Sequence, residues 1–139
     1  IFYGYRGASR SDLRIYRNST DISPSYGGNT YGVRLEGNTN RSIATADDDM
    51  NTLIAVLYNS GTGNHGVFLT RNALASSPTW TALVEPATSM PYRGVYVVGR
   101  NAAYLFGTSG AIAYWDGSVV RSLKGSLSTS GTVVGICGL

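Results

Sequence analysis

The sequence has few of the residue types on which disulfide-bonded, metal-binding and nucleic-acid-binding proteins depend. Its 139 residues include one cysteine (Cys137), one histidine (His65) and one lysine (Lys124), and only 14% of them are charged. A typical globular domain carries about 25% charged residues. Because Cys137 has no second cysteine to pair with, an internal disulfide is excluded. The apolar run around it predicts a small buried side chain.

Long apolar runs and clustered cations are also lacking. No stretch approaches the ~20 apolar residues of a membrane span, so we expect no span. The formal net charge is +3, from 11 basic and 8 acidic residues, and the basic residues are spread along the chain. Phosphate binding needs clustered cations that displace counterions, so nucleic acid is not an expected partner.

Helical periodicity is nearly absent, and short apolar runs separated by turn residues take its place. Residues 92–123 hold four such runs, joined by turns at 99–101, 107–110 and 116–117. This pattern predicts a four-stranded antiparallel meander, because Asp-Gly between apolar runs is a strong hairpin signal. We expect more than a third of all residues in strands. We also expect a positive φ at one or more of Gly107, Gly110 and Gly117.

The same order of parts recurs upstream. Four further strands are predicted at 41–46, 53–58, 67–70 and 80–84. Near the start of the chain, second, third and fourth strands are predicted at 1–5, 13–18 and 31–36. Equivalent second strands begin near residues 1, 53 and 102, which is a period of about 50 residues, typical of propeller blades.

Two groups of residues resemble a known family. The pattern Val95-x-x-Val98-Gly99, Tyr104-x-Phe106-Gly107-x-x-Gly110, Ile112-x-x-x-Asp116-Gly117 resembles a blade of the BNR/Asp-box and photosystem II assembly factor β-propellers. Thr70-Arg71-Asn72, followed by Thr79-Trp80-Thr81, is similar to an Asp-box turn that carries Thr for Ser and Asn for Asp. The resemblance implies a β-propeller and does not fix an activity.

The predicted fold is therefore all-β: a single β-propeller segment of about three four-stranded antiparallel blades. Its parts are an incomplete blade (1–37), two blades (38–90 and 91–126) and the first strand of a further blade (127–139). Propellers usually have roughly four to eight blades. The chain is thus expected to be a segment of a longer propeller, or a homo-oligomer whose copies close a ring head to tail.

The two ends of the chain are expected to be unfinished sheet edges. The first residue is Ile1 rather than Met, which indicates a processed chain, a fragment or the ordered part of a longer protein. Residues 1–3 and 133–137 are apolar and lack a neighbouring strand to cover them. Another part of the polypeptide or a second copy is expected against both, because such edges otherwise template aggregation.

Catalytic and metal-binding sets are not recognisable. His65 lies in a Gly-rich segment and is expected to be a solvated loop residue without a second ligand. The run 47–49, three aspartates, is expected to be a charged turn rather than a Ca²⁺ site. A sialidase would need an arginine cluster with a Tyr/Glu pair, and neither Glu36 nor Glu85 lies in a matching motif. We therefore expect no enzyme, no cofactor and no metal.

Binding residues are expected on the loops that join second to third strands and fourth to first strands, which gather on one face of a propeller. The candidates are Arg10, Asp12, Asn64, His65, Tyr92 and Arg93. Arginine and aromatic side chains on rigid loops commonly supply interface hot spots. Alternatively, Tyr92 covers a blade edge and Arg93 is a solvated charge. The two tryptophans, Trp80 and Trp115, are expected to pack between blades.

The expected function is that of a non-catalytic structural or protein-interaction propeller. Low charge and abundant Gly, Ser, Thr and Asn favour a scaffold in a larger extracellular, envelope or virion assembly, with protein partners. The alternative is a glycan-binding propeller, either lectin-like or related to sialidases.

Overall fold

The computed structural model describes residues 1–6, 13–33, 42–123 and 131–138. Within these ranges the protein is all-β, with 54% of residues in strands. The helical content of the described chain is one 3-10 turn, η1 (Thr108–Gly110). The sequence-based prediction of an all-β chain with more than a third of its residues in strands is confirmed.

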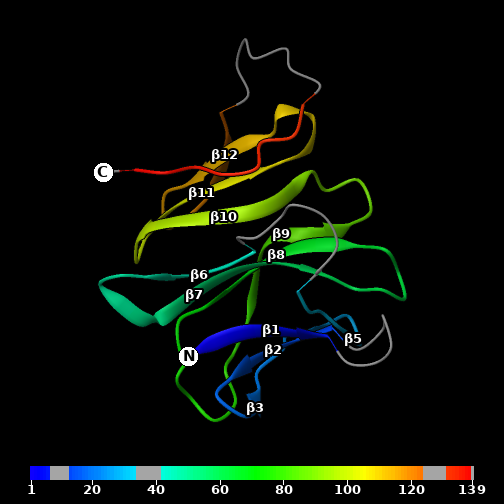
Figure 1. The fold of residues 1–139 in the computed structure, drawn as a ribbon, viewed down its shortest axis with the longest axis vertical. Coiled ribbons are helices and arrows are strands. Elements are labelled where there is room, and N and C mark those ends of the chain that lie inside the picture. The colour runs from blue at the N-terminus through cyan, green and yellow to red at the C-terminus, as the bar shows by residue number, and fades with distance from the viewer. Residues whose placement is uncertain (7–12, 34–41, 124–130, 139) are drawn as a thin grey trace.

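The strands form three sheets and a short hairpin, all antiparallel (Figure 1). The N-terminal sheet has the order β1 (Phe2–Arg6), β2 (Leu13–Arg17), β3 (Thr20–Asp21). The hairpin pairs β4 (Ser25–Tyr26) with β5 (Asn29–Thr30). The central sheet has the order β6 (Ile43–Ala46), β7 (Asp49–Tyr58), β8 (His65–Thr70), β9 (Thr81–Ala87). The C-terminal sheet has the order β10 (Tyr92–Gly99), β11 (Ala102–Gly107), β12 (Ile112–Trp115), β13 (Val120–Ser122).

The three sheets are stacked face to face, with the central sheet in the middle (Figure 1). Successive residues of a strand point to opposite faces. In β7, Ile54 and Val56 therefore face the C-terminal sheet, where they join Val95 and Leu105 in one core cluster. Leu53, Ala55 and Leu57 face the N-terminal sheet and join Ile15 and Ile22 in a second cluster. The central sheet is thus buried on both faces, which explains its continuous apolar runs.

Three glycines at the turns of the C-terminal sheet have the conformations or close contacts that require glycine. Gly110 and Gly117 have positive φ values of 66° and 92°, which confirms the expected positive φ at one or more of these glycines. Gly107 is extended, but a Cβ there would collide with the carbonyl oxygen of Pro91. The segment before β10 therefore lies directly against the end of β11.

The expected strand at residues 31–36 is wrong over its described part, residues 31–33. Gly32 instead forms a single bridge with Tyr58 at the end of β7, through hydrogen bonds of 3.0 and 2.8 Å. The physical reason is that β6 pairs with β7 only as far as Ile43 and Ala55, which leaves the main chain of Tyr58 open on that side. Residues 34–36 lie outside the described chain.

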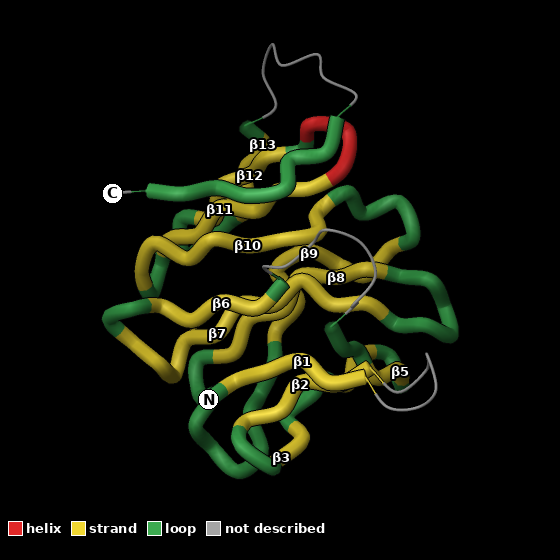
Figure 2. Tube along the Cα trace, in the orientation of Figure 1, coloured by secondary structure: helices red, strands yellow, loops and turns green. Residues whose placement is uncertain are grey.

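The first strand expected within residues 127–139 is not formed in its described part, residues 131–138. The Val133 N–H donates to the carbonyl oxygen of Gly107 (2.8 Å), and a Cβ at Gly138 would lie 3.1 Å from the hydroxyl of Tyr96. The segment therefore crosses from the end of β11 toward β10 over the outward face of the C-terminal sheet (Figure 2). Cys137 is exposed there, so the prediction of a buried thiol is wrong.

The described residues close neither a barrel nor a ring. In the same part of the chain, no helix has the length and apolar character needed to cross a membrane.

Candidate functional site

Three loops lie at the same end of the stacked sheets, on the right in Figure 2. They are the β7–β8 loop (59–64), the β9–β10 loop (88–91) and η1. The Thr108 N–H donates to the carbonyl oxygen of Pro91 at 3.0 Å. A Cβ at Gly63 would lie 3.8 Å from the methyl group of Thr88. We call this surface the loop end.

His65 does not lie in a solvated loop, so that prediction is wrong. It is the first residue of β8, is only 5% exposed and packs its ring 4.7 Å from that of Tyr58. The loop before it is shortened by Asn59, whose Oδ1 accepts hydrogen bonds from the main chain and hydroxyl of Thr62. Because the Asn59 N–H also bonds to the carbonyl oxygen of Asn64, the strand begins at the next residue. Asn64 itself is half-buried.

Tyr92 and Arg93 begin β10 at the loop end. The guanidinium of Arg93 donates to the carbonyl oxygens of Met90 and Tyr92. It therefore holds the β9–β10 loop in place, and the interpretation of Arg93 as a solvated charge is wrong. Burial raises the pKa of the Tyr92 hydroxyl. Tyr92 packs against the core between the central and C-terminal sheets, which agrees with the alternative that it covers a blade edge.

Two further candidates, Arg10 and Asp12, lie outside the described chain. The loop end therefore brings together Asn64, Tyr92 and Arg93, with His65 buried beneath it.

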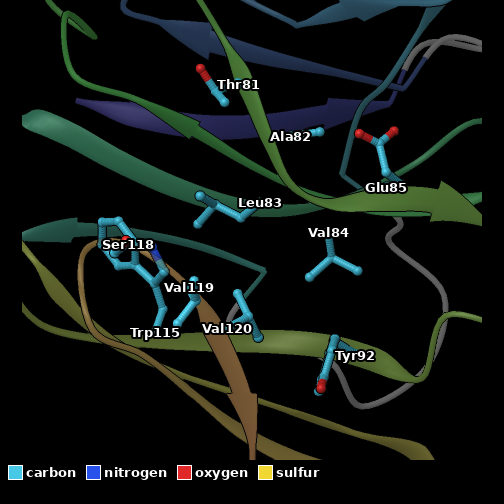
Figure 3. A pocket seen from close by; sticks show the side chains of 10 residues that line it. All are labelled: Thr81, Ala82, Leu83, Val84, Glu85, Tyr92, Trp115, Ser118, Val119 and Val120. Carbon is cyan, nitrogen blue, oxygen red and sulfur yellow. The ribbon is translucent and has the colours of Figure 1, made fainter.

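A groove of about 600 Å³ separates β9 from β13 and the turn before it (Figure 3). Both strands are the outermost of their sheets. The groove is lined by Thr81, Ala82, Leu83, Val84, Glu85, Tyr92, Trp115, Ser118, Val119 and Val120. We call it the β9–β13 groove. Of the sequence-predicted binding residues, only Tyr92 lines it.

The walls of the groove carry about as much polar as apolar surface. Leu83 and Val84 on one side and Val120 on the other are half-buried, whereas Val119 is 45% exposed. Sequence reasoning missed this site because it depends on how two sheets meet. The available signal was the apolar pair Val119-Val120, which follows Asp116-Gly117-Ser118 and leads into the outermost strand β13.

Trp115 forms the inner wall of the groove. The side chain is 1% exposed, and its Nε1 is buried with no hydrogen-bond partner in the described part of the chain. Trp80 differs, since its Nε1 donates to the carbonyl oxygen of Ile22 (2.9 Å) and ties the N-terminal sheet to the central sheet. Both side chains join neighbouring sheets, as the sequence predicts.

Glu85 is the charged residue among those that line the groove. Its carboxylate is exposed and accepts a hydrogen bond from the hydroxyl of Tyr26 on β4. This hydrogen bond is the main reason that the pKa of Tyr26 is raised. In Figure 3 this carboxylate points away from Val119, Val120 and Tyr92, so it lies on the opposite face of β9 from the groove.

The opposite end of the stack carries a polar network. Asp47 and Asp48 form the turn between β6 and β7, and Asp49 accepts hydrogen bonds from the Asn51 N–H (3.0 Å) and the Thr52 hydroxyl (2.9 Å). Those bonds, with Arg100 at 3.5 Å, hold the pKa of Asp49 below its ordinary value. In the ranges that the structure describes, no group of three or more His, Cys, Asp or Glu could hold a metal ion.

Asn72 organises the long β8–β9 connection. Its Oδ1 accepts hydrogen bonds from the Thr70 hydroxyl (2.9 Å), the Thr79 N–H (2.9 Å) and the Thr79 hydroxyl (3.2 Å). A short polar side chain that accepts bonds from nearby main-chain N–H groups replaces regular strand pairing at a turn. Here it closes the turn so that Trp80 reaches the N-terminal sheet.

Comparisons with protein-family models, with curated proteins and with solved structures found no match for this chain.

Proposed function

We propose that the chain supplies about three blades of a β-propeller that acts as a non-catalytic structural or protein-interaction element. The observation that carries this proposal is the stacking of three antiparallel sheets in chain order, with an apolar core between each neighbouring pair. A blade cannot bury both faces alone, so propeller blades are packed side by side in this manner.

The turn around Asn72 supports the same proposal. Its three accepted hydrogen bonds join the Thr70 side of the turn to the Thr79 side, which are the two halves of the Asp-box-like motif. A carboxylate or amide oxygen can fill this position equally well, because each bond is donated to a single oxygen.

The larger assembly to which we assign the chain is extracellular, part of a cell envelope or part of a virion. The support is compositional: charged residues are 14% of the chain, and Asn, Asp, Ser and Thr form its turns through side-chain hydrogen bonds. Such turns are rigid and polar without carrying a strong net charge.

The proposal is tested by site-specific photo-crosslinking in the intact protein. A benzoylphenylalanine at Ser89, which is exposed on the loop end, is expected to form adducts with another protein in the native assembly. The matched control is the same group at Ser77, an exposed serine in the β8–β9 connection, and is expected to give far fewer. A glycan array probed with the intact protein is the parallel measurement.

Protein adducts from Ser89 and no array signal would support the proposal. Equal adducts from both positions, or none from Ser89, would contradict a protein contact at the loop end. A saturable array signal would replace the proposal with the glycan-binding alternative.

A further inference from the structure

We propose that His65 is an acid-sensitive switch that opens the loop end when the pH falls from about 7 to about 5. His65 is the single histidine of the 139 residues. Histidine is the side chain whose ordinary pKa, about 6.5, lies within this range. The inference concerns the fold of this chain alone, so it does not depend on the number of blades or on the partner that the proposed function requires.

The imidazole of His65 faces the core between the central and C-terminal sheets. Residues two apart in a strand share a face, and Val67, two residues further along β8, belongs to that core cluster. His65 is 5% exposed, and its ring centroid lies 4.7 Å from that of Tyr58. Because β8 begins at His65, the buried ring lies at the edge of this core nearest the loop end.

A charged imidazolium does not suit this position. Removing a charge from water costs much more than removing a neutral ring, so burial favours the neutral form of His65. The ring of Tyr58 attracts a cation, but this attraction is weaker than the cost of burying the charge. Protonation is therefore expected in those molecules in which the imidazole has reached water.

Four other ionisable side chains lie near the loop end on the described strands that surround His65. Tyr58 on β7 and Tyr92 on β10 are phenols, which ordinarily ionise near a pH of about 10. Arg93 on β10 is already a cation, and its guanidinium donates to two main-chain carbonyl oxygens. The Glu85 carboxylate points away from the C-terminal sheet, on the other face of β9 (Figure 3). None of these four groups takes or gives a proton between pH 7 and pH 5 at the position of His65.

The start of β8 is built to separate before the rest of the strand. His65 pairs with Ala87, whereas Val67 pairs with Val84, so β9 has an extra residue between these two pairs. Such a bulge interrupts the ladder of main-chain hydrogen bonds. Opening of β8 as far as this bulge brings the imidazole to water and moves the β7–β8 and β9–β10 loops, to which the paired ends of β8 and β9 are joined.

The first test uses the unaltered chain and proton NMR. Because the chain has one histidine, the C2 proton of its imidazole gives a single resonance whose position follows protonation. We expect a titration midpoint below the ordinary value of about 6.5, since burial disfavours the charged form. A midpoint at or above that value would overturn the inference.

Hydrogen exchange of the unaltered chain locates the opening. Below a pH of about 6.5, protection factors of the amides at 65–67 are expected to fall by up to about tenfold per pH unit, because opening is coupled to uptake of one proton. Protection of the amides at 53–57, in the middle of β7, is expected to stay higher at every pH. Equal protection of the two groups at pH 5 would mean that the sheets unfold as a whole, which would contradict a switch confined to the loop end.

Two variants test whether His65 is the titrating group. His65→Phe keeps an aromatic ring beside Tyr58, and His65→Gln keeps a polar side chain, but neither titrates. Each is expected to abolish the change in protection between pH 7 and pH 5. A change that persists in both variants would overturn the inference, and the NMR titration decides the question even if one variant fails to fold.

The matched control adds Ser89→His to the His65→Phe variant. Ser89 is exposed at the loop end, so a histidine there binds protons about equally in the closed and open forms. The pH dependence is expected to stay absent, and its return would show that burial is not the cause. None of these measurements needs a partner protein, so their failure is distinguishable from a failure of the proposed function.

Discussion

The guanidinium carbon of Arg71 lies 5.4 Å from the ring centroid of Trp115. Arg71 follows β8 of the central sheet. Trp115 ends β12 of the C-terminal sheet and is the largest fully buried side chain among the described residues. The same guanidinium donates to the carbonyl oxygen of Arg100 (2.9 Å) and to Oδ1 of Asn101 (2.7 Å). One side chain therefore fastens the edges of two sheets.

Removal of this link is expected to destabilise the protein. Arg71→Met retains an apolar stem but loses the cation over the ring and two hydrogen bonds, so we expect a loss of about 1–3 kcal/mol in urea unfolding. Arg71→Lys is expected to recover only part of it, because an ammonium group lacks the planar fork. The control is Arg121→Met, which breaks an exposed pair with Asp116 and is expected to cost less than about 1 kcal/mol. Equal losses would contradict the link.

Asn72 is expected to tolerate aspartate but not alanine. Asn72→Ala leaves the Thr79 N–H and two hydroxyl groups without their acceptor, and we expect a loss of about 1–3 kcal/mol in thermal or urea unfolding. Asn72→Asp is expected to be neutral or stabilising at pH 7, since every bond is donated to one oxygen. A strongly destabilised aspartate variant would show that the amide nitrogen has a role of its own.

Acid stability is expected to depend on Asp49 and Asp116. The Thr52 hydroxyl and the Asn51 N–H lower the pKa of Asp49, and the Val119 and Ser118 N–H groups lower that of Asp116, from an ordinary value of 3.8. A lowered pKa in the folded state means that the unfolded state binds protons more tightly. This contribution is therefore complete above the ordinary pKa and is lost as the pH falls through the lower folded value.

The measurement is the urea midpoint between pH 7 and pH 2. The wild-type midpoint is expected to fall mainly below a pH of about 4. Asp49→Asn and Asp116→Asn are each expected to flatten this part of the curve and to lower the plateau at neutral pH. If the urea midpoint of a variant falls with pH as steeply as that of the wild type, its carboxylate does not contribute to the acid sensitivity.

Gly107 is expected to tolerate no side chain. A Cβ at this position would meet the carbonyl oxygen of Pro91 and the main chain of Tyr92 and Arg93, so Gly107→Ala is expected to cost about 1–3 kcal/mol. Gly131→Ala is the control, because nothing lies within 4 Å of a Cβ there, and it is expected to change stability by less than about 0.5 kcal/mol. Differential scanning calorimetry of both variants gives the comparison, and a similar melting temperature for both would contradict the close approach.

The strands of the central and C-terminal sheets could be predicted from sequence because they depend on two local signals, short apolar runs and turn residues. Apolar runs of four to six residues reveal β7 and β11, and Asp116-Gly117 reveals the turn before β13. Residues 31–33 and 132–136 have similar apolar character, but their pairing depends on which distant strand has an open edge. The periodicity of the sequence does not indicate which distant strand has an open edge.

The candidate site was predicted much less completely. Tyr92 was recognised as a binding candidate, but His65 was misplaced because the closure of its loop depends on the side chain of Asn59. The β9–β13 groove was missed altogether. Its walls come from segments about 35 residues apart, and neither Leu83 nor Val119 carries a sequence signature of its own.

Because the central sheet is buried on both faces, we expect the three sheets to unfold in a defined order. β7 has six consecutive buried residues, Thr52–Leu57, so its amide groups exchange with solvent only when a neighbouring sheet has first separated. Deuterium uptake is therefore expected to be faster in the two outer sheets than in the central sheet. A pulling force applied to either terminus is expected to unfold an outer sheet before the central sheet. Within the described residues, we therefore expect the middle sheet to be the last part to lose its structure, because each of its faces is covered by a neighbouring sheet.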